Sequence, residues 1–316
     1  MVESRRVNAC PRLWNSVFLD KDGRVYACCH YLPQAMGDIR YAPLEQIRKG
    51  PAASELRRAA LTFGTACFDS CSILTDDERD AAASLDSTDI QPLERLHVLF
   101  GEGCRLACVM CNQDHRSAEM LDSELVLRHA TPDAETSIEI QGGEPLQLKE
   151  SRAYLAAIIK MGRAPTIITN GLQLDGSLGN EVVRGCSRIK ISINAATRAT
   201  HEAINRGSSW DRVIGNIRNA VKLKRTLSRA ARLVGRMTLV PQNLHEVGAF
   251  MRLCLDLGMD AVEYGYDART LPSAIGRDPE MLQKLRDEVR AAHADCSGHL
   301  SVQIHRLAAI GLWPTE

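Results

Sequence analysis

From residue 95 onward, two hydrophobic patterns take turns along the chain. Short runs rich in β-branched residues, with apolar and polar positions alternating, are separated by longer stretches in which apolar residues recur every three or four positions. The first pattern predicts strands and the second predicts helices. Strands that alternate with helices favour a parallel β-sheet. Six strands are expected, at 95–100, 136–143, 165–171, 188–194, 233–240 and 260–267.

Such β/α units either open into a doubly wound sheet or curl into a barrel, and in both folds ligands gather at the carboxyl ends of the strands. Polar and glycine-rich stretches follow the first four predicted strands. We therefore expect a site at this rim. After the sixth strand, the pattern predicts a helix over 278–294 and a short strand over 300–305.

Residues 1–80 have a different pattern. The stretch 16–29 reads as a hairpin around Asp22-Gly23, and 44–61 reads as helical. The polar stretch "DDERDAAASLDSTD" reads as a linker. The expected organisation is a small domain over 1–80, a linker over 81–94, and a β/α domain with a C-terminal extension over 95–316.

Composition narrows the function classes. The 39 basic and 39 acidic residues give a formal net charge of zero, so there is no electrostatic footprint for nucleic acid or an anionic membrane. The sequence contains neither a run of apolar residues long enough to span a bilayer nor the apolar core of a signal peptide. We expect a cytoplasmic protein, in which clustered cysteines indicate metal binding rather than disulfides.

The eleven cysteines fall into three sets. Three stand in a C-x3-C-x2-C arrangement directly after the first strand, five lie before residue 80, and three are scattered. Three thiolates are one short of a closed four-ligand site, so either a fourth ligand comes from elsewhere or one metal corner stays open. The scattered cysteines are expected to be buried small hydrophobic residues. The sets are Cys104, Cys108 and Cys111; Cys10, Cys28, Cys29, Cys67 and Cys71; and Cys186, Cys254 and Cys296.

C-x3-C-x2-C after the first strand, with Gly142-Gly143-Glu144 ending the second, resembles the radical S-adenosylmethionine (SAM) superfamily. A three-cysteine zinc knot is the alternative, but it does not explain the glycines. The resemblance implies an α/β fold, a partial (β/α)6 barrel. It also implies that the three thiolates hold a [4Fe-4S] cluster whose open iron binds SAM, and that an adenosyl radical abstracts hydrogen from carbon. An electron donor such as flavodoxin or ferredoxin is implied as well.

The same resemblance implies further roles in SAM binding. The two glycines let the backbone approach the methionyl group, and a carboxylate accepts from its ammonium. Two polar residues at the end of the fourth strand resemble the ribose-binding pair, and an arginine resembles the partner of the SAM carboxylate. The position before the third cysteine is often aromatic in the family and is a methionine here. These residues are Gly142, Gly143, Glu144, Ser192, Asn194, Arg206 and Met110.

The first eighty residues resemble a SPASM domain, a cysteine-rich module for an auxiliary cluster that usually follows the barrel. Here it comes first. The resemblance implies a second [4Fe-4S] cluster, with Cys29 as an alternate ligand. A structural zinc site with the same ligands is the alternative. The expected ligands are Cys10, Cys28, Cys67 and Cys71.

The reaction is less constrained, because function resides in the site and not in the fold. We expect oxidation of a small polar substrate of the aminoglycoside, sugar or aminocyclitol type. A SPASM enzyme that modifies ribosomal peptides is an alternative, disfavoured because no leader-binding winged helix is recognised. A scaffold that binds SAM without turnover is the non-enzyme alternative. Residues expected near the substrate, at the end of the sixth strand, are Glu263, Tyr264, Tyr266 and Asp267.

Oxidation and epimerisation differ in the fate of the substrate radical. Oxidation needs an electron acceptor such as an auxiliary cluster, whereas epimerisation needs a hydrogen donor, typically a thiol. Cys254 is the candidate donor, with core packing as its alternative role. We favour oxidation, since the auxiliary ligands are well marked.

Overall fold

One ten-stranded sheet runs through the computed structural model, which describes residues 8–29, 34–69, 71, 74–82, 84–271, 275 and 278–313. The strand order is β10-β9-β8-β7-β6-β5-β4-β1-β2-β3. The strands are β1 (Ser16–Leu19), β2 (Arg24–Tyr26), β3 (Gly37–Asp38), β4 (Arg95–Leu99), β5 (Ser137–Gln141), β6 (Thr166–Thr169), β7 (Arg188–Ser192), β8 (Arg232–Leu239), β9 (Ala261–Tyr266) and β10 (Ser301–Gln303).

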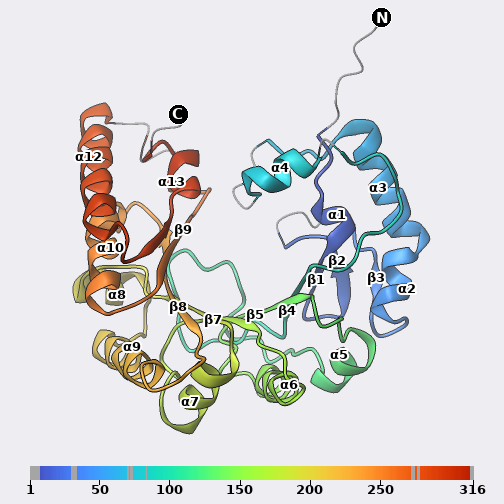
Figure 1. Ribbon diagram of the computed structural model, residues 1–316, viewed down its shortest axis with the longest axis horizontal. Helices are drawn as coiled ribbons and strands as arrows, with labels where there is room; N and C mark the ends of the chain where they lie inside the picture. Colours follow the sequence, from blue (N-terminus) through green and yellow to red (C-terminus); the bar gives the residue numbers. More distant parts are fainter. Residues whose placement is uncertain are drawn as a thin grey trace, which may run out of the picture.

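Helices cover the convex side of this sheet, which curls into an open barrel (Figure 1). Along the outside lie α5, α6, α7 and α9, while α10 and α12 form one arm and α2 and α3 the other. The helices are α1 (Arg12–Asn15), α2 (Leu44–Lys49), α3 (Pro51–Phe63), α4 (Asp76–Ala82), α5 (Ser123–His129), α6 (Lys149–Lys160), α7 (Gly176–Gly185), α8 (Arg198–Ile204), α9 (Trp210–Lys224), the 3-10 helix η1 (Leu244–Glu246), α10 (Val247–Asp256), α12 (Pro279–Cys296) and α13 (His305–Ala309).

The six predicted strands are confirmed as β4 to β9, each parallel to the next. The expected helix and short strand after them are confirmed as α12 and β10, and β10 extends the parallel set. The predicted hairpin is β1 and β2. Its turn residue Gly23 has φ +84°, a conformation that glycine adopts without steric cost.

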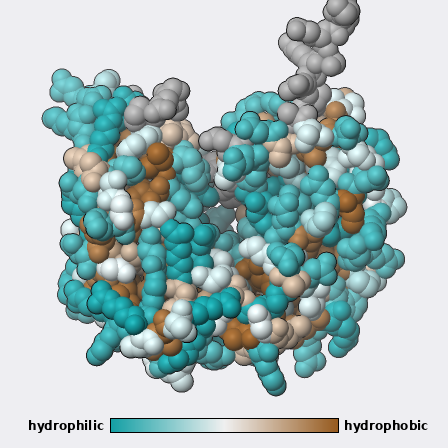
Figure 2. Space-filling model, in the orientation of Figure 1, coloured by the Kyte–Doolittle hydropathy of each residue, from teal (hydrophilic) through white to brown (hydrophobic). Residues whose placement is uncertain are grey.

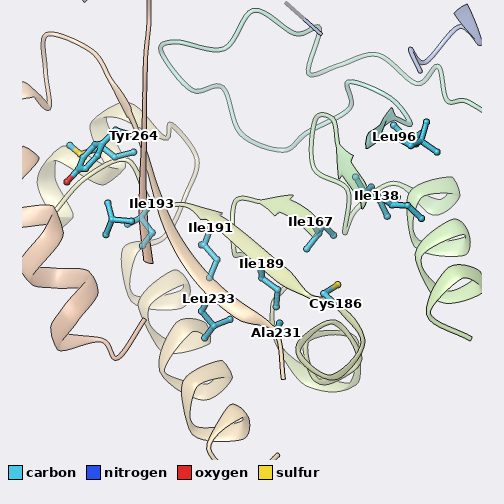
Figure 3. Close-up of a cluster of buried hydrophobic side chains, with 14 of the residues drawn as sticks. Leu96, Ile138, Ile167, Cys186, Ile189, Ile191, Ile193, Ala231, Leu233 and Tyr264 are labelled. Atoms are coloured by element: carbon cyan, nitrogen blue, oxygen red, sulfur yellow. The ribbon is translucent and has the colours of Figure 1, made fainter. Parts of the chain in front are cut away.

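Alternate residues of the parallel strands form the core between the sheet and the outer helices. Ile167 pairs in register with Ile189 and Ile189 with Leu233, and all three side chains are fully buried. Figure 3 shows several of these side chains beside the strands and helices. Because side chains alternate across a strand, the intervening residues face the inside of the barrel. Those residues are mostly polar or charged.

The N-terminal part shares its sheet with the barrel. β1 pairs in parallel with β4, so that Ser16 is level with Arg95 and Leu19 with Val98. The domain limits at residues 80 and 95 stay a prediction, but the two parts pack through a common sheet.

The polar stretch expected to be a linker begins with a helix, because residues 76–82 form α4. Glu78 of this helix pairs with Arg12 at 3.0 Å and with Arg95, on β4, at 2.7 Å. Two ion pairs thus hold α4 against α1 and β4, a constraint that its polar composition did not reveal.

No helix in the described parts of the chain combines the length and the apolar character that a bilayer crossing requires.

Candidate active site

A cavity of about 290 Å³ lies where the sequence predicts a site, at the carboxyl ends of the central strands. All three cysteines of the C-x3-C-x2-C stretch line it, together with residues from the ends of β5 to β8. Its walls are Cys104, Leu106, Cys108, Met110, Cys111, Asn112, Gln113, Gln141, Gly142, Gly143, Ile168, Thr169, Asn170, Ser192, Asn194, Arg236 and Thr238. The topology therefore gathers the separate stretches at one rim.

The two glycines after β5 are required by the loop that carries the cysteines. A Cβ on Gly143 would overlap the carbonyl oxygens of Glu102 and Gly103. A Cβ on Gly142, whose φ is +153°, would lie 2.6 Å from the carbonyl oxygen of Gly101. The Gly143 N–H donates to that same carbonyl at 2.9 Å. Only glycine permits this backbone contact.

Hydrogen bonds from distant segments hold the cysteine loop in place. The N–H groups of Ala107 and Val109 donate to the carbonyls of Arg206 and Ile204, both at 3.0 Å. From beyond β9, the guanidinium of Arg269 donates to the carbonyl of Met110 at 2.8 Å. The sequence analysis missed Arg269, which nothing in its local pattern distinguishes from a surface arginine.

The thiols suit a metal centre chemically. Burial raises the pKa of Cys104, and it raises that of Cys108 to about 12. Thiolates buried in this way need positive charge beside them, which iron supplies. In the described part of the chain no three Cys, His, Asp or Glu side chains enclose a single metal position. The fit therefore rests on the soft donors sharing one cavity with room for a ligand.

A second cavity of about 310 Å³ occupies the inside of the barrel, and we call it the lumen. It shares Gln141, Ile168 and Arg236 with the first cavity, so the two adjoin. Its lining is Arg12, Cys29, Thr75, Glu78, Arg95, His97, Ser137, Glu139, Gln141, Thr166, Ile168, Arg188, Lys190, Arg236, Glu263, Gln303, His305 and Arg306. Figure 2 shows hydrophilic residues around the opening between the two arms.

Ion pairs neutralise the carboxylates of the lumen. Lys190 contacts Glu139 at 2.8 Å and Glu263 at 3.3 Å, and Arg188 contacts Glu263 at 3.5 Å. Burial alone would raise the pKa of Glu139, but Lys190 and His97 outweigh it and lower that pKa to about 2. Glu139 is therefore ionised, and both Glu139 and Glu263 are held in ion pairs.

The N-terminal cysteines divide into four and one. Burial, together with the neighbouring thiols of Cys28 and Cys71, raises the pKa of Cys10 to about 12. The pKa of Cys67 is raised first by burial and then by the thiols of Cys71 and Cys28. Cys28 and Cys71 thus lie within electrostatic reach of both Cys10 and Cys67. Cys29 instead faces the lumen, and its pKa is raised by a hydrogen bond with Cys28 and by burial.

Family models match both halves of this arrangement. Residues 98–254 match the radical SAM superfamily, and residues 10–72 match SPASM, an iron-sulfur cluster-binding domain. The chain belongs to the radical SAM superfamily. It carries a SPASM domain, and the two domains imply SAM and iron-sulfur clusters as cofactors.

Curated relatives match only part of the chain. A probable GTP 3',8-cyclase of Saccharolobus islandicus is 26% identical over 178 residues, which are 54% of this chain and 56% of that protein. A probable GTP 3',8-cyclase of Metallosphaera sedula is 30% identical over 137 residues, which are 41% and 43% of the two chains. The chain thus spans about half the length of the curated relatives it matches.

Among solved structures, Streptococcus suis SuiB bound to its precursor peptide SuiA superposes with a TM-score of 0.53. It is 16% identical, and the match covers 80% of this chain and 62% of SuiB. Native anSMEcpe with bound AdoMet and Kp18Cys peptide superposes with a TM-score of 0.50 at 13% identity, over 67% and 64% of the two chains. At these identities the likeness concerns the fold alone.

Glu144 has a different position in this radical SAM chain from the one expected. Its side chain is fully buried and absent from the cavity wall. One carboxylate oxygen accepts from the Leu146 N–H at 3.1 Å and the Thr169 hydroxyl at 2.7 Å, and the other accepts from the Asn170 N–H at 2.7 Å. Glu144 therefore braces the end of β6, whose residues Thr169 and Asn170 line the cavity.

We expect Glu144→Gln to destabilise the protein by on the order of 1 to 3 kcal/mol. Each carboxylate oxygen accepts from a backbone N–H. In the glutamine variant, the side-chain NH2 group would replace one of these oxygens and would face a backbone N–H that it cannot accept from. Burial raises the pKa of Glu144 to about 7, and protonation still leaves two acceptor oxygens. Urea unfolding of wild type and variant measures the difference, with the exposed Glu124→Gln as control; equal midpoints would contradict this role.

The other expected SAM contacts have mixed outcomes. Met110, Ser192 and Asn194 all line the cavity. Asn194, at φ +61°, also accepts from the Thr238 N–H at 2.8 Å, which ties β7 to β8. Arg206 is exposed and does not line the cavity; its carbonyl supports the cysteine loop. The SAM-binding roles of all four residues stay predictions.

The expected acidic patch at the end of β9 is wrong. Tyr264 and Tyr266 pack on the core side of the strand, and the Tyr264 hydroxyl donates to the Val247 carbonyl at 2.8 Å. Asp267 pairs with Arg269 at 2.8 Å. Only Glu263 faces the lumen, where it is already paired. Because side chains alternate between the two faces of a strand, those of residues 264 and 266 both point outward when that of residue 263 points into the barrel.

The scattered cysteines are buried, as expected. Cys254 is fully buried on the outer face of β8, where its sulfur would overlap a Cβ placed on Gly235. Its position is therefore wrong for a hydrogen donor to a substrate inside the barrel. Among the residues that the structure describes, Cys29 is the cysteine that lines the lumen.

Proposed function

We propose that the chain is a radical SAM oxidoreductase that removes hydrogen from a polar substrate bound in the lumen. One observation carries the proposal. The lumen adjoins the cavity of the cysteine loop, and its wall contains Cys29, the chain neighbour of Cys28. A substrate there has a radical source at one end and an electron acceptor at the other.

The register supports this placement. Tyr26 on β2 is level with Phe18, and Phe18 is level with His97 in β4. Because β2 runs antiparallel to β1, the chain after Tyr26 continues toward the amino end of β4, opposite the cysteine loop. Cys28 and Cys29 follow at once.

The proposed reaction is a two-electron oxidation. When bound, SAM and its cluster supply an adenosyl radical that removes one hydrogen atom from a carbon of the substrate. The substrate then loses a proton and one electron, and the electron leaves toward the N-terminal cysteines. The lumen residues bind and orient the substrate and keep bulk water away.

A cationic aminoglycoside fits this lumen poorly, because the carboxylates of the lumen are already paired with lysine and arginine side chains. A neutral or anionic polar substrate fits better. Peptide modification is the second candidate, favoured by the fold shared with SuiB in complex with its precursor peptide. In that case a side chain of the peptide enters the lumen.

Ile168 allows a direct test, because it lines both cavities where they adjoin. Ile168→Trp should close the connection. Because Ile168 also borders the SAM cavity, 5'-deoxyadenosine formed from SAM and dithionite without substrate is measured for each variant, and substrate-dependent turnover is expressed relative to it. The substrate-dependent turnover of Ile168→Trp should fall about tenfold or more, the cost of losing a positioned substrate. Ile168→Val, which keeps the space open, is the matched control.

Substrates for this test are found by anaerobic assay of sugars, aminoglycosides, nucleotides and peptides, following 5'-deoxyadenosine formation. No 5'-deoxyadenosine from reconstituted wild type under any condition would refute the enzyme proposal. Substrate turnover by Ile168→Trp at the wild-type rate would remove the lumen as the substrate site.

A further inference from the structure

Two arginines of the lumen form no ion pair with any residue that the structure describes. The lining holds six cationic side chains against three carboxylates. Glu78, Glu139 and Glu263 are all engaged by other cations. In the described part of the chain, the guanidinium groups of Arg236 and Arg306 form neither an ion pair nor a hydrogen bond, and the buried Nε of Arg306 is unsatisfied. A buried donor without an acceptor is costly, so these groups call for an acceptor.

The two guanidinium groups lie within electrostatic reach of each other. Burial and then the like charge of Arg236 lower the pKa of Arg306, and the carboxylate of Glu263 offsets only part of this lowering. Arg236 is level with Ser192 on β7 and with Glu263 on β9, on the inner face of the sheet. A terminal nitrogen of Arg306 would lie 3.3 Å from a Cβ placed on Gly265. The absence of a side chain at Gly265 therefore leaves room for this guanidinium over β9.

We propose that the lumen binds an oxyanion of the substrate, a carboxylate or a phosphate, between Arg236 and Arg306. An arginine matches either group with paired N–H donors, and two arginines around one anion remove both the unsatisfied donor and the repulsion. The proposal deepens the proposed function, because the anchored anion belongs to the substrate that is to be oxidised. Arg236, which also borders the SAM cavity, would hold the anion close to the radical source.

The carboxylate of SAM is the competing occupant for Arg236. Arg306 separates the two cases, because it lines the lumen and not the SAM cavity. An anion bound by both arginines should bind alongside SAM, whereas an anion bound by Arg236 in place of the SAM carboxylate should compete with SAM.

The test uses reconstituted enzyme saturated with SAM. Pyrophosphate and glutarate are the probe anions, and chloride at the same ionic strength is the reference. Calorimetry gives the dissociation constants. Phenylglyoxal labelling, mapped by mass spectrometry, gives protection of Arg306. We expect one or both probes to bind and to protect Arg306. Arg236→Gln and Arg306→Gln should each weaken binding about tenfold or more, as expected for loss of a charge-assisted contact. Arg290→Gln on the surface of α12 should bind as wild type does.

Preference for pyrophosphate identifies a phosphorylated substrate, and preference for glutarate a carboxylate; either supports the proposal. No protection of Arg306 in wild type by either probe would overturn it, independently of how the variants fold. Competition of the probes with SAM would overturn it too. Formation of 5'-deoxyadenosine without substrate is measured on the same samples, so a failure of the enzyme proposal is recognised separately from a failure to bind anions.

Discussion

Replacing Cys104, Cys108 and Cys111 together by alanine should abolish 5'-deoxyadenosine formation and leave the N-terminal metal centre in place. The three thiols line one cavity, while the N-terminal cysteines lie on other elements. With two four-iron clusters, reconstituted wild type should hold about eight irons and the triple variant about four. Iron analysis and SAM cleavage assays measure both quantities.

Cys186→Ala is the matched control, since this cysteine is buried in the outer core. Its iron content and SAM cleavage should equal those of wild type. If wild type instead contains about four irons and one zinc, the N-terminal site is a structural zinc site. A triple variant that still forms 5'-deoxyadenosine would remove the cysteine loop from the reaction.

The second large effect concerns the two adjacent cysteines after β2. If the enzyme oxidises its substrate, Cys28→Ala should still consume SAM but form little oxidised product, because the electron loses its acceptor. Cys29→Ala should stay active, and product formed in deuterated water should carry no deuterium at the reacting carbon. Mass spectrometry measures the amount and deuterium content of the product, and a 5'-deoxyadenosine assay measures SAM cleavage. Cys254→Ala is the control, and it should change neither product formation nor SAM cleavage.

The opposite pattern identifies an epimerase. A product of unchanged oxidation level that carries solvent deuterium, lost only in Cys29→Ala, would make Cys29 the hydrogen donor. Its position in the lumen wall gives it the access that Cys254 lacks. The thiyl radical left on Cys29 would then need an electron and a proton, and Cys28 beside it belongs to the group that would supply the electron.

The sequence by itself determined the elements and the position of the rim. Alternation of apolar residues along strands such as 188–194 depends only on which face is buried, so it is visible without the fold. The glycines and cysteines were also readable, because each follows a strand and parallel strands end at the same edge. These are local features combined with one rule of topology.

Only the tertiary structure decided what each polar side chain does. Glu144 follows the two glycines, yet its partners Thr169 and Asn170 come from another strand. Asp267 forms an ion pair with Arg269, and Arg269 also donates a hydrogen bond to the carbonyl of Met110, 159 residues away. Tyr264 and Glu263 are neighbours in sequence, but they lie on opposite faces of β9.

The same holds for the cysteines and the lumen. The spacing of Cys28 and Cys29 does not say which of the two joins the N-terminal group, whereas the pairing of β1 with β4 turns Cys29 toward the inside of the barrel. The cationic excess of the lumen is likewise invisible in a chain whose net charge is zero. Burial and pairing of charges depend on contacts between distant segments, and those contacts exist only once the strands have assembled into the curved sheet.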